Sequence, residues 1–291
     1  MTRAGIVTVA GRPNVGKSTL LNRIVGQKLS IVSPKPQSTR DRVVGIHTSG
    51  DVQMILHDTP GLLDPAYELQ RAMRATAVRA LRDADVIIHV EDATDPSPPP
   101  LHAAAGLDAP PRAPIVLALN KSDLLSPAAR RELATAPDTV LVSARTGDGI
   151  SALLERCIAH LPESPFLYPA DDVSTQTVRF FTTELVRETA LEQLDDELPY
   201  SLACEIEEFR EGGSPLYVRA VLYVERESQK RILVGAGGRQ IKRIGQASRA
   251  KVEALVGESV YLDLWVKVLP NWRKSAAALA RFGYQRAEEP R

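Results

Sequence analysis

The chain contains 291 residues, of which 44% are hydrophobic and 25% carry a charged side chain. This length allows two domains, and the composition is typical of a soluble globular protein. Basic and acidic residues balance at 36 each, so the formal net charge is zero, which excludes nucleic-acid binding through overall charge and leaves only a local basic patch.

Other global features argue against a secreted or membrane-spanning chain. The two cysteines, Cys157 and Cys204, lie far apart in sequence, which is typical of buried thiols in a reducing cytosol. The N-terminus leads directly into an apolar run, so we expect no signal peptide. No apolar run approaches membrane-spanning length, and no lipidation motif is present.

The first predicted element is a buried strand over 6–10, followed by a phosphate-binding loop and a helix that begins near Thr19. The loop has the sequence G-R-P-N-V-G-K-S, which fits G-x-x-x-x-G-K-[ST] in the strand–loop–helix context that this motif requires. Its glycines let backbone N–H groups approach phosphate oxygens, and the helix N-terminus favours an anion. We expect Lys17 to reach the β- and γ-phosphates and Ser18 to bind Mg²⁺. The predicted nucleotide contacts here are Gly11, Arg12, Pro13, Asn14, Val15, Gly16, Lys17, Ser18 and Thr19.

A polar loop that contains Ser38-Thr39-Arg40-Asp41 follows the first helix. A threonine hydroxyl in such a loop can bind Mg²⁺ and sense the γ-phosphate, so that loss of this phosphate releases the loop. Spacing alone leaves Ser38 and Thr39 open as the ligand. We name Thr39 as the candidate.

A second predicted strand, over 52–56, contains polar Gln53 and leads to Asp58-Thr59-Pro60-Gly61. An Asp at a strand end beside the first loop can hold Mg²⁺ through a water, and the Gly61 N–H can approach the γ-phosphate because no Cβ intrudes. Its position after the phosphate loop favours this interpretation over an ordinary β-turn. Leu62 follows, where Ras-like proteins have a Gln that orients the attacking water. The chain therefore needs another group, a bound ion or a partner for this step, and we expect slow intrinsic hydrolysis.

Two further predicted strands carry the signals for the base. The strand over 115–119 ends in Asn120-Lys121-Ser122-Asp123, and the Asp123 carboxylate can accept hydrogen bonds from guanine N1–H and the 2-amino group. Adenine would leave that carboxylate unpaired, so N-K-x-D favours GTP over ATP. The strand over 139–142 leads to Ser143-Ala144, where a backbone N–H can donate to guanine O6, and an amphipathic helix over 150–161 follows. These segments add as predicted contacts Asp58, Thr59, Pro60, Gly61, Asn120, Lys121, Asp123, Ser143 and Ala144.

Prolines between Leu161 and Asp172 predict the end of the first domain and a semi-stiff linker. The fold that we expect is an α/β P-loop nucleotide domain over 1–165, a linker over 166–175 and an α+β domain over 176–291. In the second domain the patterns predict, in order, a helix over 183–198, strands over 200–208 and 216–224 joined by a Gly-Gly-Ser-Pro turn, helices over 229–234 and through 241–252, a strand over 260–268 and a helix over 272–282.

Gly235-Ala236-Gly237-Gly238 joins the two middle helices of this second domain. A helix–GxxG–helix beside a three-stranded sheet resembles a KH domain, in which the loop lets a sugar-phosphate chain lie close and a neighbouring groove takes about four unpaired nucleotides. A tight turn is the alternative, but basic residues crowd the interval and no Asp or Glu occurs from Ser228 to Val252. The predicted RNA contacts are Lys230, Gly235, Ala236, Gly237, Gly238, Arg239, Lys242 and Arg243.

Taken in order, the first-domain motifs resemble those of translation-factor-class bacterial GTPases, and with the C-terminal half they resemble the Era family over almost the whole chain. The resemblance implies a P-loop GTPase domain followed by a type II KH domain, and attack of water on the γ-phosphate of GTP to give GDP and phosphate. It further implies binding near the 3′ end of small-subunit ribosomal RNA and a role in small ribosomal subunit assembly and maturation. A monomer is also expected, in the cytoplasm and with peripheral association at the inner face of the cell membrane.

The same resemblance implies Mg²⁺ as a cofactor and K⁺ as a second expected ion, because Asn14 resembles the asparagine that helps hold K⁺ in K⁺-stimulated relatives. The candidate metal ligands are Ser18, Thr39 and Asp58. The candidate catalytic residues are Lys17, Thr39, Gly61 and Asn14.

Three features depart from the family pattern. The stretch from Asp95 to Pro114 is proline-rich where relatives carry a longer helix, the piece between Asp123 and Ser143 is short, and S-A-R replaces the common S-A-K. These departures bear on peripheral helices and leave the nucleotide contacts in place.

Two rival functions stay open. A GTPase tied to RNA modification would need a further catalytic domain, for which 291 residues leave no room. A KH module with an inert nucleotide domain is the other, and the intact Lys17, Ser18 and Asp58 argue against it.

Overall fold

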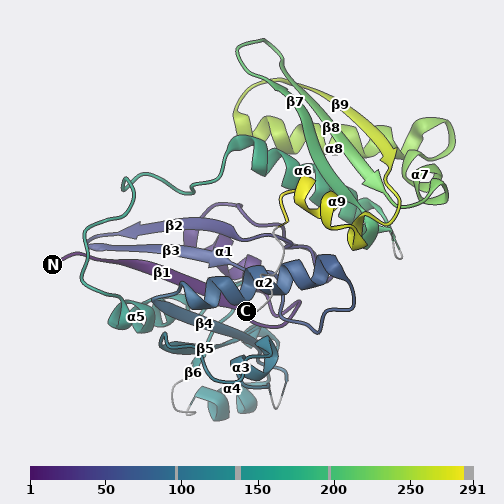
Figure 1. Ribbon diagram of the computed structural model, residues 1–291. Helices are drawn as coiled ribbons and strands as arrows, with labels where there is room; N and C mark the ends of the chain where they lie inside the picture. The colour runs from purple at the N-terminus through teal and green to yellow at the C-terminus, as the bar shows by residue number, and fades with distance from the viewer. Residues whose placement is uncertain (96–97, 135–138, 196–197, 285–291) are drawn as a thin grey trace. The chain divides into compact units, whose positions relative to one another are not determined.

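The computed structural model describes residues 1–95, 98–134, 139–195 and 198–284, which form two compact units (Figure 1). The first unit holds residues 1–66 and 70–175, and the second begins at Gln176 and includes Tyr67–Leu69. Parts of several predictions lie outside the described residues: 96–97 of the proline-rich stretch, 135–138 of the short piece before Ser143, 196–197 of a predicted helix and 285–291 of the second domain.

The first unit is built on a six-stranded sheet with the strand order β2-β3-β1-β4-β5-β6. β2 pairs antiparallel with β3, and the other pairs are parallel. The central strands are apolar and almost fully buried, as expected for a sheet with helices on both faces. This confirms the predicted α/β class. The strands are β1 (Arg3–Ala10), β2 (Val43–Ser49), β3 (Val52–Asp58), β4 (Val86–Asp92), β5 (Ile115–Asn120) and β6 (Thr139–Leu141).

The helices of this unit are α1 (Lys17–Val25), α2 (Glu68–Arg82), α3 (Leu101–Ala105), α4 (Pro127–Ala134) and α5 (Ile150–His160), with a 3₁₀ turn η1 (Ser122–Leu124). Helix α1 begins at Lys17, two residues before the predicted start, because Gly16 caps it in the left-handed region at φ 96°. The proline-rich stretch leaves α3 only five residues long. The comparison with a longer helix in relatives stays a prediction.

Several elements of the first unit were not predicted, among them β2, β4, α2 and α4. The mainly apolar runs Val43–Ile46 and Val86–Val90 are the sequence signals that could have predicted the two strands. Both runs are buried in the sheet. The motif residues lie at the ends of other elements. These strands therefore have no motif that would mark them.

The second unit has a three-stranded sheet with the order β7-β8-β9, in which β8 pairs antiparallel with β7 and parallel with β9. The predicted α-β-β-α-α-β order is confirmed. Alternate residues of β8, from Leu216 to Val224, join the core that α6 and α8 cover. The elements are α6 (Val178–Gln193), η2 (Pro199–Ser201), β7 (Ala203–Arg210), β8 (Leu216–Val224), α7 (Glu227–Val234), η3 (Ala236–Gly238), α8 (Arg239–Val256), β9 (Val260–Val268), η4 (Trp272–Lys274) and α9 (Ala276–Arg281).

Two predicted helix boundaries in the second unit were wrong. The helix predicted over 183–198 spans Val178–Gln193, because the Thr177 hydroxyl accepts a hydrogen bond from the Phe180 N–H at 3.2 Å and caps it. The helix predicted over 272–282 is broken at Ser275. That residue is extended, and its hydroxyl caps α9 by accepting from the Ala278 N–H at 3.3 Å.

The segment between the two domains is fixed to the first unit by a buried polar side chain. Gln53 of β3 is fully buried, and its Oε1 accepts from the backbone N–H groups of Leu167 (2.8 Å) and Tyr168 (3.0 Å). Its Nε2 donates to the Tyr168 carbonyl at 2.9 Å. Further along, the Ile46 N–H of β2 donates to the Val173 carbonyl at 2.9 Å. The buried polar side chain of Gln53 is therefore explained by its hydrogen bonds to the backbone N–H and C=O groups of the linker.

Candidate functional site

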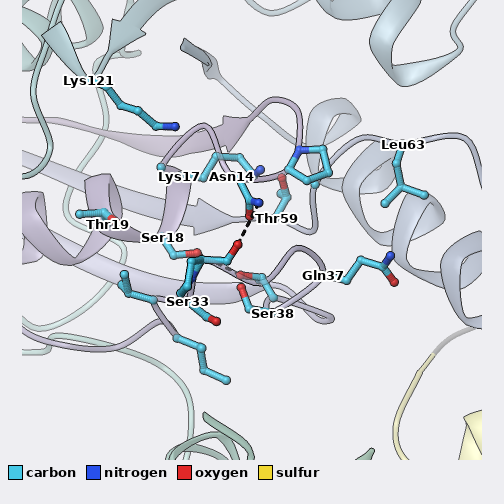
Figure 2. A pocket seen from close by; sticks show the side chains of 17 residues that line it. Asn14, Lys17, Ser18, Thr19, Ser33, Gln37, Ser38, Thr59, Leu63 and Lys121 are labelled. Carbon is cyan, nitrogen blue, oxygen red and sulfur yellow. Dashed lines mark hydrogen bonds between the residues drawn. The ribbon is translucent and has the colours of Figure 1, made fainter. Parts of the chain in front are cut away.

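The predicted motifs lie at one edge of the six-stranded sheet. Parallel strands bring their carboxyl ends to the same edge, and Gly11, Thr59 and Lys121 each follow such a strand directly. Residues from these segments and from the loop after α1 line a cavity of about 450 Å³. Figure 2 shows Asn14, Lys17 and Ser18 close together in its wall, with Lys121 and Leu63 further out on opposite sides.

Two glycines let the phosphate loop pass close to neighbouring strands. A Cβ at Gly11 would lie 2.1 Å from the Val90 carbonyl oxygen, and one at Gly16 would lie 2.2 Å from Asn120 Nδ2. The loop is thus packed against β4 and β5 by backbone contacts that only glycine permits. Its N–H groups and the N-terminus of α1 give it the geometry of an anion cradle.

Lys17 is buried at the base of this loop, 6% exposed. Its Nζ donates to the carbonyl oxygens of Gly11 (3.0 Å) and Arg12 (2.7 Å). Burial lowers the pKa of Lys17 to about 8, and the charges of Asp58 and Glu91 oppose that shift. An incoming phosphate would be a further anionic partner for this ammonium group.

The three candidate metal ligands meet at one point. Ser18 Oγ lies 2.6 Å from Asp58 Oδ2 and 3.0 Å from Thr39 Oγ1, and Thr39 Oγ1 lies 3.5 Å from the same Asp58 oxygen. Ser38, the alternative that spacing left open, lines the cavity, whereas Thr39 makes these contacts.

The Asp58 carboxylate is suited to a hard cation. It is fully buried, and within the described residues its Oδ1 has no hydrogen-bond partner. Burial raises the pKa of Asp58, against the hydrogen bond from Ser18 and the charge of Lys17. A buried carboxylate oxygen without a partner, beside two hydroxyls, fits Mg²⁺, which prefers oxygen ligands and keeps several waters.

Asn120 joins the phosphate loop to the segment after β6. Its Nδ2 donates to the Val15 carbonyl at 2.8 Å, and its Oδ1 accepts from the Ala144 N–H at 2.9 Å. Lys121 Nζ pairs with Asp92 Oδ2 at 2.7 Å. The structure therefore brings together the phosphate loop, the Asn120–Asp123 segment and Ser143-Ala144, which the sequence analysis assigned to one nucleotide site.

Asp123 is held by two groups. Ser143 Oγ donates to its Oδ1 at 2.6 Å, and the Arg145 guanidinium pairs with its Oδ2. The Ser143 hydrogen bond and the Arg145 charge hold the pKa of Asp123 below its ordinary value, so the carboxylate is an ionised acceptor. Arg145 was not among the predicted contacts, because its role depends on the pairing with Asp123.

The segment after Asp58 turns its leucine away from the cavity. A Cβ at Gly61 would lie 2.8 to 2.9 Å from atoms of Pro13, and the Leu62 N–H donates to the Gly11 carbonyl at 3.0 Å. The Leu62 side chain is 3% exposed and belongs to a core cluster with Ile87 and helix residues. Leu62 therefore has a packing role, in accord with its inability to orient water.

Asn14 reaches the loop that contains the candidate metal ligand Thr39. Its backbone is left-handed, with φ 64°, and its Nδ2 donates to the Pro34 carbonyl at 3.1 Å. Pro34 and Gln37 line the cavity with it and were not predicted. Nothing in the local sequence identifies them, because they enter the site through this tertiary contact.

In the second unit, the predicted GxxG segment forms a tight turn between α7 and α8. Gly235, Gly237 and Gly238 have φ values of 74°, 59° and 76°, in the left-handed region. The turn borders a groove of about 830 Å³ that also includes Ile232, Arg239 and residues at the end of α6. A Cβ at Gly237 would meet nothing within 4 Å, so one face of the turn is open.

The basic residues near this turn fall into two groups. Lys251 pairs with Glu188 and Glu192, and Arg249 lies 3.7 Å from Glu253. Lys230, Arg239, Lys242 and Arg243 make no ion pair with a carboxylate among the described residues. These four are the basic residues among the eight predicted RNA contacts, and their charge is available to an anionic ligand.

Comparisons with known proteins agree with both units. Residues 6–121 match the family described as 50S ribosome-binding GTPase, and residues 197–273 match the KH domain family. GTPase Era of Carboxydothermus hydrogenoformans is 40% identical over 295 residues, covering 98% of this chain and 99% of that protein. GTPase Era of Pseudomonas fluorescens strain Pf0-1 is 41% identical over 292 residues, covering 97% of each.

Two solved structures are similar over nearly the full length. A variant of Aquifex aeolicus Era bound to GDP·AlF4⁻ superposes with a TM-score of 0.91 at 35% identity, covering 97% of this chain and 99% of that one. Era in complex with MgGDPNP and nucleotides 1506–1542 of 16S ribosomal RNA gives the same TM-score and identity, covering 98% and 99%. On this identity and coverage, the chain belongs to the Era family of GTPases.

Proposed function

We propose that this chain is a GTP-driven switch that binds small-subunit ribosomal RNA near its 3′ end and assists assembly and maturation of the small ribosomal subunit. The observation that carries the switch is the meeting of Ser18, Thr39 and Asp58. It ties the phosphate loop, the loop before β2 and the end of β3 to one cation position. Loss of the γ-phosphate would remove one partner of that cation and release Thr39.

The hydrolytic step uses groups that stabilise charge. Lys17 and the Gly61 N–H would face the γ-phosphate, and Ser18, Thr39 and Asp58 would hold Mg²⁺, which supplies positive charge at the phosphates. Leu62 is packed in the core, so the attacking water takes its position from another group. We assign part of the missing positive charge to K⁺ held near Asn14, which lines the cavity.

The base would lie where Asn120, Lys121 and Asp123 converge with Ser143 and Ala144. Asp123 is ionised and keeps lone pairs beyond those that Ser143 and Arg145 use, since a carboxylate has about four acceptor sites. It can therefore accept from guanine N1–H and the 2-amino group. The Ala144 N–H already donates to Asn120 Oδ1. Guanine O6 would therefore either share this N–H or accept from a neighbouring backbone N–H.

RNA binding is assigned to the turn and groove of the second unit. The similar Era complex contains 16S ribosomal RNA nucleotides, and the KH family matches this part of the chain. Open space over Gly237, with Arg239 and Arg243 in the neighbouring groove, is what a sugar-phosphate chain requires. We propose a GTPase domain over 1–165, a linker over 166–175 and a KH domain over 176–291; the division between compact units at Thr175 supports these bounds.

Location and assembly state follow from the family resemblance alone. We propose a cytoplasmic monomer with peripheral association at the inner face of the cell membrane. Across the residues that the structure describes, no helix has both the length and the apolar character to cross a bilayer. Co-sedimentation with vesicles and the mass of the protein in solution test the two statements.

Asp123 should decide base identity. Asp123→Asn removes the ionised acceptor, so GTP binding should weaken by roughly 2 to 4 kcal/mol, and xanthine nucleotide should gain, because the amide can pair with the extra carbonyl. Calorimetric titration of both nucleotides checks this exchange. Unchanged GTP affinity in the variant would sink the assignment.

Asn14 should affect turnover more than binding. If it holds K⁺ at the phosphates, hydrolysis should be faster in K⁺ than in Na⁺, and Asn14→Ala should remove most of that difference, because the added charge acts on the transition state. Single-turnover rates in the two salts at equal ionic strength provide the measurement. A parent enzyme indifferent to the cation rules out the K⁺ role.

The Gly235–Gly238 turn should clamp RNA. Ala236→Asp with Gly237→Asp places two negative charges where phosphates should lie, so binding to an oligonucleotide from the 3′ end of small-subunit ribosomal RNA should fall about tenfold or more. GTP affinity should not change, because the nucleotide site belongs to the other unit. Lys242→Ala should weaken binding less and lower its salt dependence by about one released ion. Parental RNA affinity in a folded double variant contradicts the clamp.

A further inference from the structure

A buried carboxylate lies behind the phosphate loop and was not among the predicted site residues. Glu91 is near the carboxyl end of β4 and is fully buried. Its neighbour two residues earlier, His89, is 5% exposed and lies on the same side of the strand, as alternate strand residues do. An acidic residue buried in a central strand needs partners, because burial of an unpaired charge is costly.

Both carboxylate oxygens of Glu91 have such partners. Arg12 of the phosphate loop donates from Nε (2.8 Å) and Nη2 (2.6 Å) to Oε2. His89 Nε2 lies 2.9 Å from Oε1, and since an ionised carboxylate only accepts, the ring N–H donates. Burial raises the pKa of Glu91, but the hydrogen bonds from His89 and Arg12 outweigh burial and hold it below its ordinary value.

The main chain at Arg12 connects this carboxylate to the reacting groups. The Arg12 carbonyl accepts from Lys17 Nζ at 2.7 Å, and the Gly11 carbonyl accepts from both Lys17 Nζ and the Leu62 N–H at 3.0 Å. On the other side of Arg12, Pro13 lies against Gly61. A displacement of Arg12 would therefore move the ammonium group of Lys17 and the backbone at Gly61 together.

The Arg12 guanidinium also pairs with a second carboxylate, Asp95, which is more exposed to solvent than Glu91. Its Nη2 lies 2.6 Å from Asp95 Oδ2, whose side chain is 31% exposed, whereas the Glu91 side chain is 0% exposed. Exposed ion pairs contribute little, because water and salt screen them. The inner carboxylate, which water does not screen, is the one that can fix the position of the loop.

We propose that Glu91 is a positioning residue for GTP hydrolysis. Through Arg12 it holds the phosphate loop so that Lys17 and the Gly61 N–H stand where negative charge develops on the transferred phosphoryl group. Such groups stabilise a transition state only when they are already in place, and a displacement of about 1 Å costs on the order of a hundredfold in rate. This role rests on the nucleotide site proposed above.

The test replaces Glu91 by Gln in the full-length protein and measures three quantities. Single-turnover hydrolysis should fall by roughly tenfold to a hundredfold, while GDP affinity should stay within about threefold of the parent. Affinity for GDP with aluminium fluoride, which mimics the transferring phosphoryl group, should fall in parallel with the rate. A general loss of folding would instead lower both affinities together. Asp95→Asn, which removes only the outer partner of the same guanidinium, is the matched control and should hydrolyse GTP within about twofold of the parent.

A second variant keeps the proposal testable if Glu91→Gln does not fold. Arg12→Lys keeps the positive charge but loses the fork that Glu91 grips, so it should show the same loss in rate and in aluminium fluoride affinity. Where both variants fold, the double variant should be no slower than the slower single one, because both break one contact. Parental hydrolysis in either folded single variant overturns the proposal. Lys17→Ala serves as the reference that should bind GDP poorly. If the parent binds GDP no better than this reference, the nucleotide site is refuted, and not the role of Glu91.

Discussion

The buried carboxylate of Asp58 ties together the parts of this protein that respond to nucleotide. It lies at the carboxyl end of β3, with one oxygen bonded to Ser18 and close to Thr39 and the other without a partner among the described residues. A buried charge in this state is costly unless a cation completes its environment. Helix α1, the loop before β2 and β3 would therefore share the one cation position that we propose, and this shared position would be the physical basis for a switch.

The surrounding structure serves to hold that position. Gly11 and Gly16 bring the phosphate loop against β4 and β5, Asn120 ties it to the segment after β6, and Glu91 grips Arg12 from behind. The strand that ends in Asp58 also carries Gln53, which binds the backbone of the linker. The linker backbone is thus hydrogen-bonded to the strand that ends in Asp58, the candidate metal ligand.

Much of the fold and of the nucleotide site was predictable, because the motifs specify both residue type and local backbone. The phosphate loop needs a strand before it and a helix after it, and N-K-x-D needs a strand end, so Ser18, Asp58 and Asn120 could be placed from spacing. Elements without such markers were missed, as β2 and β4 show. Helix boundaries failed where a single hydroxyl decides them, as at Thr177 and Ser275. Glu91 and Arg145 could not be found from the sequence, because their partners come from distant segments.

The central proposal, that this chain is a GTP-driven switch that binds small-subunit ribosomal RNA, is tested most directly by one affinity measurement. The full chain is titrated with a fluorescent oligonucleotide from the 3′ end of small-subunit ribosomal RNA, once with MgGDPNP and once with MgGDP. Binding should be tighter with MgGDPNP by about tenfold, equivalent to a coupling free energy of ~1.4 kcal/mol, and Thr39→Ala should abolish the difference. Equal affinity in the two nucleotide states would contradict the account.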